Sequence, residues 1–469
     1  MPIERLKALY VNTFAKEVSR MEQLSPSGSG RCYFRMQSEL NRVMGVYNKD
    51  WKENRAFLAF TKHFLSVGLD VPEILAEDTE NHIYILSDLG DETLYSYRCK
   101  YNEFTPDLIQ TYKKAIKQLL LFQTRGGEGL DYSLCYPRAA FDRQSIYWDL
   151  NYFKYYFLKL AQIPFDEQLL ENDFELFSRF LLEADADYFM FRDFQSRNIM
   201  LQNDKLFFID YQGGRKGALP YDLASLLYDG KAAIPPSIRH ELLDYYVGEL
   251  DNLHIWDVDL FRKYYPAFVL VRIMQAMGSY GYRGFYERKE HFLQSIPYAL
   301  KNLNWILNNV NLPIEIPTLW NVFEKLVHSE KLQAIKQHRL HVEISSFSYK
   351  NAYPPDESGN GGGFVFDCRC LPNPGRYEAY KHLSGKDRSV IEFLEKEKDV
   401  ILFFEHITSI IDMAVQNYLA RDFTHLSIAF GCTGGQHRSV YFVEKLARYL
   451  QTNYPVRISL KHTKQMNWE

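Results

Sequence analysis

The sequence is poor in the features that mark secreted and membrane-spanning proteins. Its 469 residues contain only six cysteines, and none are spaced as a zinc site, since Cys368 and Cys370 are one residue too close for CxxC. The longest apolar runs, such as FVLVRIM (268–274), fall far short of the roughly 20 residues that cross a bilayer. The N-terminus has no apolar core of the signal-peptide type. These absences predict a reduced, cytoplasmic protein with no membrane contact.

An excess of positive charge is also missing. The chain has 55 Lys and Arg against 59 Asp and Glu, a formal net charge of −4, so any RNA binding would need a local basic patch. A hydrophobic fraction of 46% and a charged fraction of 24% exclude a wholly disordered or fibrous chain. Aromatic residues are in excess, at 16%, and supply a sizeable core.

Hydrophobic patterning divides the chain into two parts of different character. The first part has short strands near its start, long helical stretches, and one strand-rich insert. The predicted elements are strands over 31–36, 42–47 and 82–90, a helix over 51–66, helices over 105–185, strands over 188–211, and helices over 221–310.

The second part begins after Gln337, and we place the boundary between 330 and 340. Strands and helices alternate there at short spacing, which is typical of a smaller α/β domain. The predicted elements are strands in HVEISSFSYKN and FVFDCRCL, a loop over 359–363, helices over 387–397 and 402–420, a strand over 425–431, a helix after GCTGGQHRS, and a strand in VRISLKH.

Three polar residues in YFMFRDFQSRNIMLQNDKLFFIDYQGG carry the first functional signal. Asp193, Asn198 and Asp210 are separated by 5 and 12 residues and lie between strand-like segments. Phosphoryl transfer needs a carboxylate to orient the attacking hydroxyl and oxygen ligands for Mg²⁺ on the phosphates. Asp193 suits the first role, and Asn198 with Asp210 suits the second. A loop with Asx turns is the plain alternative, because Asp and Asn are common turn residues.

These motifs resemble the aminoglycoside phosphotransferase family of kinase-like enzymes, and in particular its branch of N-acetylmuramate/N-acetylglucosamine anomeric kinases (AmgK type). RDFQSRN resembles the catalytic loop, IDYQ the metal-binding motif, and PYDLASLL (220–227) the segment whose Asp supports that loop. The resemblance implies an α+β bilobal kinase-like fold with lobes at 1–90 and 91–335. It also implies use of ATP and Mg²⁺, with Arg192 positioning the catalytic loop.

The resemblance assigns the nucleotide to the N-terminal lobe. SPSGSGR (25–31) would cover the phosphates and ILSDLG (85–90) would be the hinge for adenine. The strand RVMGVY has no phosphate-binding lysine, and we considered Lys49, Lys52 or Arg42 as substitutes, with Glu53 heading the next helix. The candidate nucleotide-binding residues are Ser27, Gly28, Ser29, Gly30, Arg31, Ser87, Asp88 and Leu89.

A later segment, QAMGSYGYRGFYERKEHFLQSI (275–296), gathers Tyr, Arg and Gly residues. Aromatic faces beside a cation suit a pocket for a sugar acceptor. An aromatic core with a charged, solvated face explains the same pattern, so both interpretations stay open.

The second functional signal is GCTGGQHRS, between a predicted strand and helix. Glycines and a hydroxyl at a helix N-terminus form a nest for an anion, and Arg438 adds positive charge. Cys432 and Arg438 also have the Cys-x5-Arg spacing of tyrosine phosphatases, in which a thiolate attacks phosphorus. That alternative needs a general acid, and the sequence identifies none.

The block 341–465 resembles the C-terminal domain of RapZ, an RNase adapter protein. The resemblance implies a domain at 340–469 that binds glucosamine-6-phosphate and, in that family, partners a small RNA and an endonuclease. The P-loop ATPase that precedes this domain in RapZ is replaced here by the kinase-like domain, and Asn351 stands where a member of that family has His. The implied phosphosugar-binding residues are Lys350, Asp367, Arg369, Asn373, Cys432, Thr433, Gly434, Gly435, His437, Arg438 and Ser439.

Together these signals predict an ATP- and Mg²⁺-dependent sugar kinase fused to a sensor of a phosphorylated amino sugar. The missing strand lysine leaves a second hypothesis, a catalytically inactive kinase fold that senses glucosamine-6-phosphate and bridges to an RNA or protein partner.

Overall fold

The computed structural model describes residues 2–24, 30–101, 103–335, 340–351, 362–420, 423–454 and 456–463. The chain forms two compact units, Met1–Ile335 and Lys336–Glu469. Among the described residues no helix is long and apolar enough to cross a membrane.

The N-terminal lobe of the first unit is a five-stranded antiparallel sheet with strand order β1-β2-β3-β5-β4. Two helices accompany it, and Asp50 caps the second by accepting hydrogen bonds from the backbone N–H groups of Lys52 and Glu53. The elements are α1 (Pro2–Phe14), β1 (Arg20–Gln23), β2 (Cys32–Gln37), β3 (Arg42–Tyr47), α2 (Trp51–Ser66), β4 (Ile74–Asp78) and β5 (Ile83–Ser87).

Strand β5 shows why this sheet is covered on both faces. Its first four residues, Ile83–Leu86, are apolar and buried, as expected for a strand buried on both sides. Ile83 and Ile85 pack into a small cluster with α1, whereas Tyr84 and Leu86 pack into the large core that contains α2. Successive side chains of a strand point to opposite faces, so one strand contributes to two cores.

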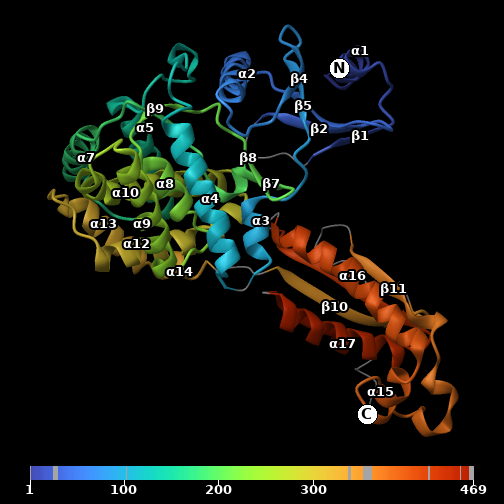
Figure 1. The fold of residues 1–469 in the computed structure, drawn as a ribbon. Coiled ribbons are helices and arrows are strands. Elements are labelled where there is room, and N and C mark those ends of the chain that lie inside the picture. The colour runs from blue at the N-terminus through green and yellow to red at the C-terminus, as the bar shows by residue number, and fades with distance from the viewer. Residues whose placement is uncertain are drawn as a thin grey trace. The chain divides into compact units, whose positions relative to one another are not determined.

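The C-terminal lobe is mainly helical, as predicted (Figure 1). Its α-helices are α3 (Leu94–Cys99), α4 (Pro106–Gln123), α5 (Arg143–Phe153), α6 (Lys159–Ala161), α7 (Glu167–Leu182), α8 (Pro220–Leu227), α9 (Pro236–Leu253), α10 (Val258–Tyr280), α11 (Glu290–Leu293), α12 (Ile296–Asn309), α13 (Pro317–Val327) and α14 (Glu330–Gln333).

The strand-rich segment predicted at 188–211 is confirmed as parts of two small antiparallel ladders. One pairs β6 (Tyr188–Met190) with β9 (Arg215–Gly217), and the other pairs β7 (Ile199–Gln202) with β8 (Lys205–Phe208). Asn203 and Asp204 turn β7 into β8 with φ of 51° and 62°, the left-handed conformation that two-residue hairpin loops require.

The second unit contains a four-stranded parallel sheet with order β11-β12-β10-β13, which confirms the predicted α/β domain. The predicted strand FVFDCRCL is wrong in its second half. β11 ends at Asp367, whose carboxylate accepts a hydrogen bond from the backbone N–H of Arg369 (2.9 Å) and starts a 3-10 turn. The elements are β10 (His341–Ser348), β11 (Phe364–Asp367), α15 (Arg388–Glu395), α16 (Lys398–Ala420), β12 (His425–Cys432), α17 (Arg438–Asn453) and β13 (Arg457–His462). Most of the loop predicted over 359–363 lies outside the described residues.

Candidate active site

Asp222, at the start of α8, holds the loop that follows β6. The Asp222 carboxylate accepts hydrogen bonds from the backbone N–H groups of Phe191 (2.7 Å) and Arg192 (2.9 Å). Its burial raises the pKa of Asp222 to about 7, although the two backbone donors act in the opposite direction. The prediction that the Asp of PYDLASLL supports the RDFQSRN loop is therefore confirmed.

Arg192 has a left-handed backbone, with φ of 81°. Its guanidinium donates two hydrogen bonds to Asp149 (2.6 and 2.8 Å) and lies over the rings of Phe141 and Tyr221. These contacts occupy the side chain fully within the lobe. These contacts suit a residue that positions the loop. Of the neighbours Arg192 and Asp193, only Asp193 lines the cavity described below.

Hairpin β7–β8 brings Asn198 and Asp210 together. Asn198 precedes β7 and Asp210 follows β8, and the ladder ends with the Ile209 N–H donating to the Asn198 carbonyl (3.0 Å). The Asn198 amide nitrogen donates to the backbone carbonyl of Asp193 (2.9 Å) and to Asp210 (3.2 Å). This orientation leaves the Asn198 amide oxygen available to a ligand.

The Asn198–Asp210 pair fits Mg²⁺, which prefers oxygen ligands and keeps part of its shell from water and phosphates. Burial, and then the neighbouring charge of Asp193, raise the pKa of Asp210, so a cation beside it would stabilise the ionised form. No cluster of three or more His, Cys, Asp or Glu residues suited to a metal is found in the described part of the chain. A site made only of protein ligands is therefore not present among those residues.

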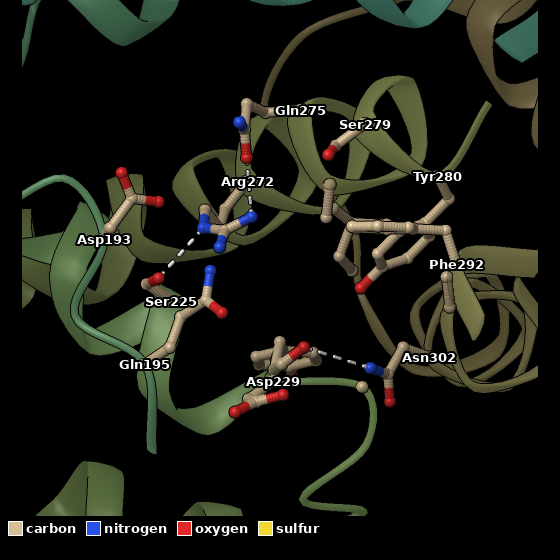
Figure 2. A pocket seen from close by; sticks show the side chains of 15 residues that line it. Asp193, Gln195, Ser225, Asp229, Arg272, Gln275, Ser279, Tyr280, Phe292 and Asn302 are labelled. Atoms are coloured by element: carbon tan, nitrogen blue, oxygen red, sulfur yellow. Dashed lines mark hydrogen bonds between the residues drawn. The ribbon is translucent and has the colours of Figure 1, made fainter. Parts of the chain in front are cut away.

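A cavity of about 160 Å³ opens beside Asp193 (Figure 2). Arg272 of α10 projects into it while donating to the Ser225 hydroxyl (2.9 Å) and to the Gln275 side-chain oxygen (2.7 Å). No hydrogen-bond donor among the described residues occupies the Asp193 carboxylate. The lining residues are Asp193, Gln195, Ser225, Tyr228, Asp229, Gly230, Arg272, Ile273, Gln275, Ala276, Ser279, Tyr280, Phe292, Ala299 and Asn302.

Part of the segment 275–296 lines this cavity, which favours its interpretation as part of a pocket over an aromatic core with a charged, solvated face. Gln275, Ala276, Ser279, Tyr280 and Phe292 all face the cavity that Asp193 borders. The sequence did not single out Arg272, Asp229 or Asn302, which reach the same cavity from α10, from the end of α8 and from α12. A buried arginine within an apolar helix was the available signal for Arg272.

Arg31 is a buried cation that polar contacts link to Asp210, one of the proposed metal ligands. It lies directly before β2, only 3% exposed, with its guanidinium 3.1 Å from Glu53 of α2 and over the ring of Phe57. Gln212 donates to the same oxygen of Glu53 (3.2 Å) and to Asp210 (2.7 Å). A chain of polar contacts therefore links Arg31 to Asp210 through α2.

Lys49, Lys52 and Arg42, the suggested substitutes for the missing lysine, differ in their surroundings, and their role stays a prediction. Lys49 is exposed, and Lys52 is exposed over the ring of Trp51. Arg42 is paired with Asp88, at 2.7 Å. Arg31, a predicted nucleotide-binding residue, lies directly before β2, the strand next to RVMGVY, so its buried guanidinium is a further candidate for this role.

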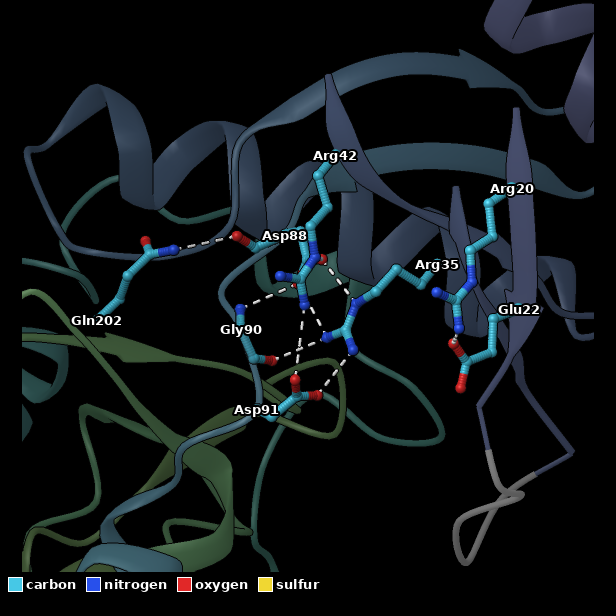
Figure 3. Close-up of polar contacts among 8 residues, drawn as sticks. All are labelled: Arg20, Glu22, Arg35, Arg42, Asp88, Gly90, Asp91 and Gln202. Atoms are coloured by element: carbon cyan, nitrogen blue, oxygen red, sulfur yellow. Dashed lines mark hydrogen bonds and ion pairs between the residues drawn. The ribbon is translucent and has the colours of Figure 1, made fainter. Parts of the chain in front are cut away.

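The hinge is braced by ion pairs (Figure 3). Arg35 of β2 contacts Asp88 (2.7 Å) and Asp91 (2.8 Å), and Arg42 of β3 contacts Asp88. Burial alone would raise the pKa of Asp88, but Arg35, the Gly90 backbone N–H and Arg42 hold it below its usual value. The Asp88 side chain therefore stabilises the hinge as a carboxylate.

The backbone of the hinge leaves one residue for a ligand. The Ser87 N–H donates to the Glu73 carbonyl (3.0 Å), and the Asp88 carbonyl accepts from the Gln202 side chain (3.2 Å). Neither the N–H nor the C=O of Leu89 makes a hydrogen bond with a described residue. Of the three residues predicted as the hinge, Leu89 is thus the one whose backbone groups are open to a ligand. Gly30 is exposed, and Ser27, Gly28 and Ser29 lie outside the described residues.

In the second unit, the turn from β12 to α17 forms the predicted anion loop. The Gly435 N–H donates to the Cys432 sulfur (3.2 Å), and the Ser439 hydroxyl lies 3.2 Å from it. Burial alone would raise the pKa of Cys432, but hydrogen bonds from Ser439 and Gln436 and the charge of Arg438 lower it. Gly435 has φ of 67°, and a Cβ there would lie 3.0 Å from the Ser348 backbone N, so the turn requires glycine.

Arg438 is fixed beneath this loop and is only 3% exposed. It donates to the backbone carbonyls of Arg369 (3.1 Å) and Leu371 (2.8 Å) and lies 3.5 Å from the Thr433 hydroxyl. Its Nε atom is buried without an acceptor among the described residues. An anion bound at the loop would supply the missing acceptor.

The remaining predicted phosphosugar residues differ in how far their side chains are already engaged in contacts. Arg369 pairs with Asp367 (2.7 Å) and lies over Tyr349, and Asn373 caps its own turn by accepting from the Gly375 N–H (3.2 Å). His437 contacts the Tyr380 carbonyl (2.8 Å), and burial lowers its pKa. Lys350 is exposed, and a Cβ at Gly434 would meet no neighbour.

Comparison with known proteins identifies both units. The model of the phosphotransferase enzyme family matches residues 23–256, and the model of the RapZ C-terminal domain matches residues 340–465.

Among curated relatives, a nucleotide-binding protein of Xylella fastidiosa (strain 9a5c) is 38% identical over 124 residues, 26% of this chain and 38% of the relative. One from Hahella chejuensis is 31% identical over 185 residues, 37% of this chain and 62% of the relative. The chain thus spans less than two thirds of the length of each of these relatives.

Solved structures that resemble the chain include an ADP-bound aminoglycoside phosphotransferase, at 14% identity and a TM-score of 0.43, covering 68% of this chain and 98% of that one. A choline kinase from Cryptosporidium parvum has 12% identity and a TM-score of 0.42, covering 65% and 93%. From the two family models and the bilobal first unit, the chain joins a kinase-like domain of the phosphotransferase enzyme family to a RapZ C-terminal domain.

Proposed function

We propose that the first unit is an ATP- and Mg²⁺-dependent kinase that phosphorylates a hydroxyl of an amino sugar of cell-wall metabolism. The observation that carries the proposal is the position of Asp193. Its carboxylate borders a small polar cavity, while Asn198 donates to its backbone carbonyl and to Asp210. One loop thus connects an acceptor cavity to a pair of oxygen ligands.

The cavity suits a sugar because it combines polar and aromatic groups. The side-chain amides of Gln195, Gln275 and Asn302 can bond hydroxyl and N-acetyl groups, and the rings of Tyr280 and Phe292 offer apolar faces.

In this mechanism Asp193 accepts the proton of the acceptor hydroxyl late in transfer. Arg192, held by Asp149 and Asp222, keeps the loop in place, and Arg31 stabilises charge on the phosphate oxygens. Mg²⁺, when bound, neutralises charge on the β- and γ-phosphates, and Asn198 and Asp210 would hold it.

A continuous kinase assay over N-acetylated and plain amino sugars tests the proposal. Asp193→Asn should abolish turnover without loss of ATP binding, whereas Asp251→Asn, an exposed change in α9, should retain turnover. Wild-type turnover by Asp193→Asn on the best substrate would contradict the assignment. ATP binding without turnover on any sugar would support the second hypothesis, an inactive kinase fold that bridges to an RNA or protein partner.

We further propose that the second unit binds a phosphorylated amino sugar and regulates the first. The buried Arg438 with a free Nε, below a loop of backbone N–H groups, supports phosphate binding. A typical coupling of about 1–3 kcal/mol changes affinity roughly 5- to 150-fold and acts in both directions. Calorimetry with glucosamine-6-phosphate, with and without kinase ligands, measures it, and equal affinities would exclude coupling.

A further inference from the structure

A second cavity in the helical lobe has a composition unlike that of the acceptor cavity. It measures about 150 Å³ and is bounded by α9, α10 and α12. Its wall is largely apolar and contains one buried cation, Arg239. The lining residues are Tyr228, Arg239, His240, Leu243, Tyr265, Pro266, Val269, Trp305, Ile306, Asn309 and Val310.

Arg239 is only 7% exposed and has no carboxylate within ion-pair distance among the described residues. Its Nε and Nη1 atoms are shielded from solvent and have no hydrogen-bond acceptor there. The guanidinium lies over the rings of Tyr228 (4.5 Å) and Trp305 (5.6 Å). Cation–π contacts of this kind stabilise a cation by about 0.5–2 kcal/mol each and provide no acceptor for its N–H groups.

The histidine that lines the cavity beside Arg239 does not compensate the charge. His240 uses Nδ1 in a contact with the Pro236 carbonyl (3.1 Å) and is exposed. The Tyr228 hydroxyl accepts a hydrogen bond from Arg239, but it is no counter-ion. An arginine buried without an anion is costly, because guanidinium keeps its charge at any physiological pH. Buried charges in proteins are normally paired, so this cavity lacks the partner that its cation requires.

We infer that this cavity binds a small organic anion, with a carboxylate against Arg239 and an apolar body against Leu243, Val269 and Ile306. An apolar cavity of about this volume accommodates a benzene ring. The cavity therefore suits a monocarboxylate with one ring or a short branched chain. Tyr228 also lines the acceptor cavity, so the two sites share a wall. The inference does not depend on the kinase proposal.

Calorimetry and ligand-observed NMR on the full chain test it with three probes: benzoate, benzyl alcohol and inorganic phosphate. Benzoate should bind, with benzyl alcohol and phosphate each at least about 10-fold weaker, because only benzoate combines the charge and the ring. Absence of benzoate binding would overturn the inference. Equal binding of benzyl alcohol would exclude recognition by Arg239, and equal binding of phosphate would exclude an organic ligand.

Two variants locate the site. Arg239→Gln should weaken benzoate about 10- to 100-fold, the range for a charge-assisted hydrogen bond. Arg262→Gln, an exposed arginine of α10 paired with Asp244, is the matched control and should bind as the wild type does. If Arg239→Gln does not fold, Leu243→Phe narrows the cavity and leaves the arginine intact, and it should also weaken benzoate. Wild-type affinity in Leu243→Phe would place benzoate elsewhere and refute the site.

Discussion

The variant Arg31→Gln tests whether the first unit is an active kinase or a catalytically inactive kinase fold. Two unit charges about 3.1 Å apart, the distance from Arg31 to Glu53, attract by roughly 5 kcal/mol at an effective dielectric constant of about 20. Desolvation offsets much of this gain, but removing one partner of a buried pair typically costs about 3–5 kcal/mol. Glu53 is 23% exposed and keeps hydrogen bonds from Asn48 and Gln212, so we expect a loss of about 2–3 kcal/mol in the free energy of unfolding.

The effect on catalysis should be larger than the effect on folding. Loss of one preorganised donor to a developing charge typically lowers kcat about 100- to 1000-fold. Arg31→Gln should therefore lower kcat/KM by that factor and weaken ATP binding, measured by coupled assay and calorimetry on folded protein. Arg31→Lys keeps the charge and should recover part of both quantities. Glu53→Gln should lower kcat/KM less than Arg31→Gln does. The double variant should lose less transition-state stabilisation than the two single variants together, because the two residues interact.

Arg20→Gln is the matched control, since Arg20 lies on β1 in an exposed pair with Glu22 (Figure 3). It should change neither stability nor turnover measurably. The reasoning is refuted if Arg31→Gln keeps wild-type ATP affinity and kcat/KM. It is also refuted if Arg42→Gln, at the hinge, produces the catalytic loss in its place.

Three further predictions concern single carboxylates and the anion loop. Asp193→Asn should lower kcat at least about 100-fold with ATP affinity unchanged, whereas a parallel loss of ATP binding would indicate misfolding. The pKa of Asp222 is about 7 when folded and near 3.9 when unfolded, so its contribution to stability falls as pH rises between about 4 and 7. In Asp222→Asn that fall should disappear from denaturation curves measured at pH 5 and pH 7, and an unchanged slope would argue against burial as its cause. Arg438→Ala should abolish glucosamine-6-phosphate binding while the exposed Arg388→Ala retains it, and binding by both would exclude the loop.

Local pattern was sufficient for most of the fold. The apolar run Ile83–Leu86 indicated a buried strand, and the helical period over 51–66 indicated α2. The spacing of Asp193, Asn198 and Asp210 indicated a phosphoryl-transfer loop, because a two-residue hairpin fixes which residues before and after it meet. These features depend on neighbours within about 20 residues, so periodicity and turn chemistry reveal them.

Tertiary packing decided which distant residues meet, and it also separated functional from supporting charges. Arg192 was identified from the sequence beside Asp193, but only packing shows Asp149, 43 residues away, holding its guanidinium. Arg31 contacts Glu53 because α2 packs against the sheet that contains β2, and nothing in either segment alone specifies that contact.

Both cavities form between segments that are far apart in the sequence. Asp193 and Asn302 border one space, and Arg239 and Trp305 border another, although each pair is separated by more than 60 residues. The sequence by itself determined which segments become helices and strands and which loop carries the candidate catalytic carboxylate. Whether a charge ends paired, stacked on an aromatic ring, or open to a ligand depended on helix packing, because the cost of burying a charge is set by everything that surrounds it in three dimensions.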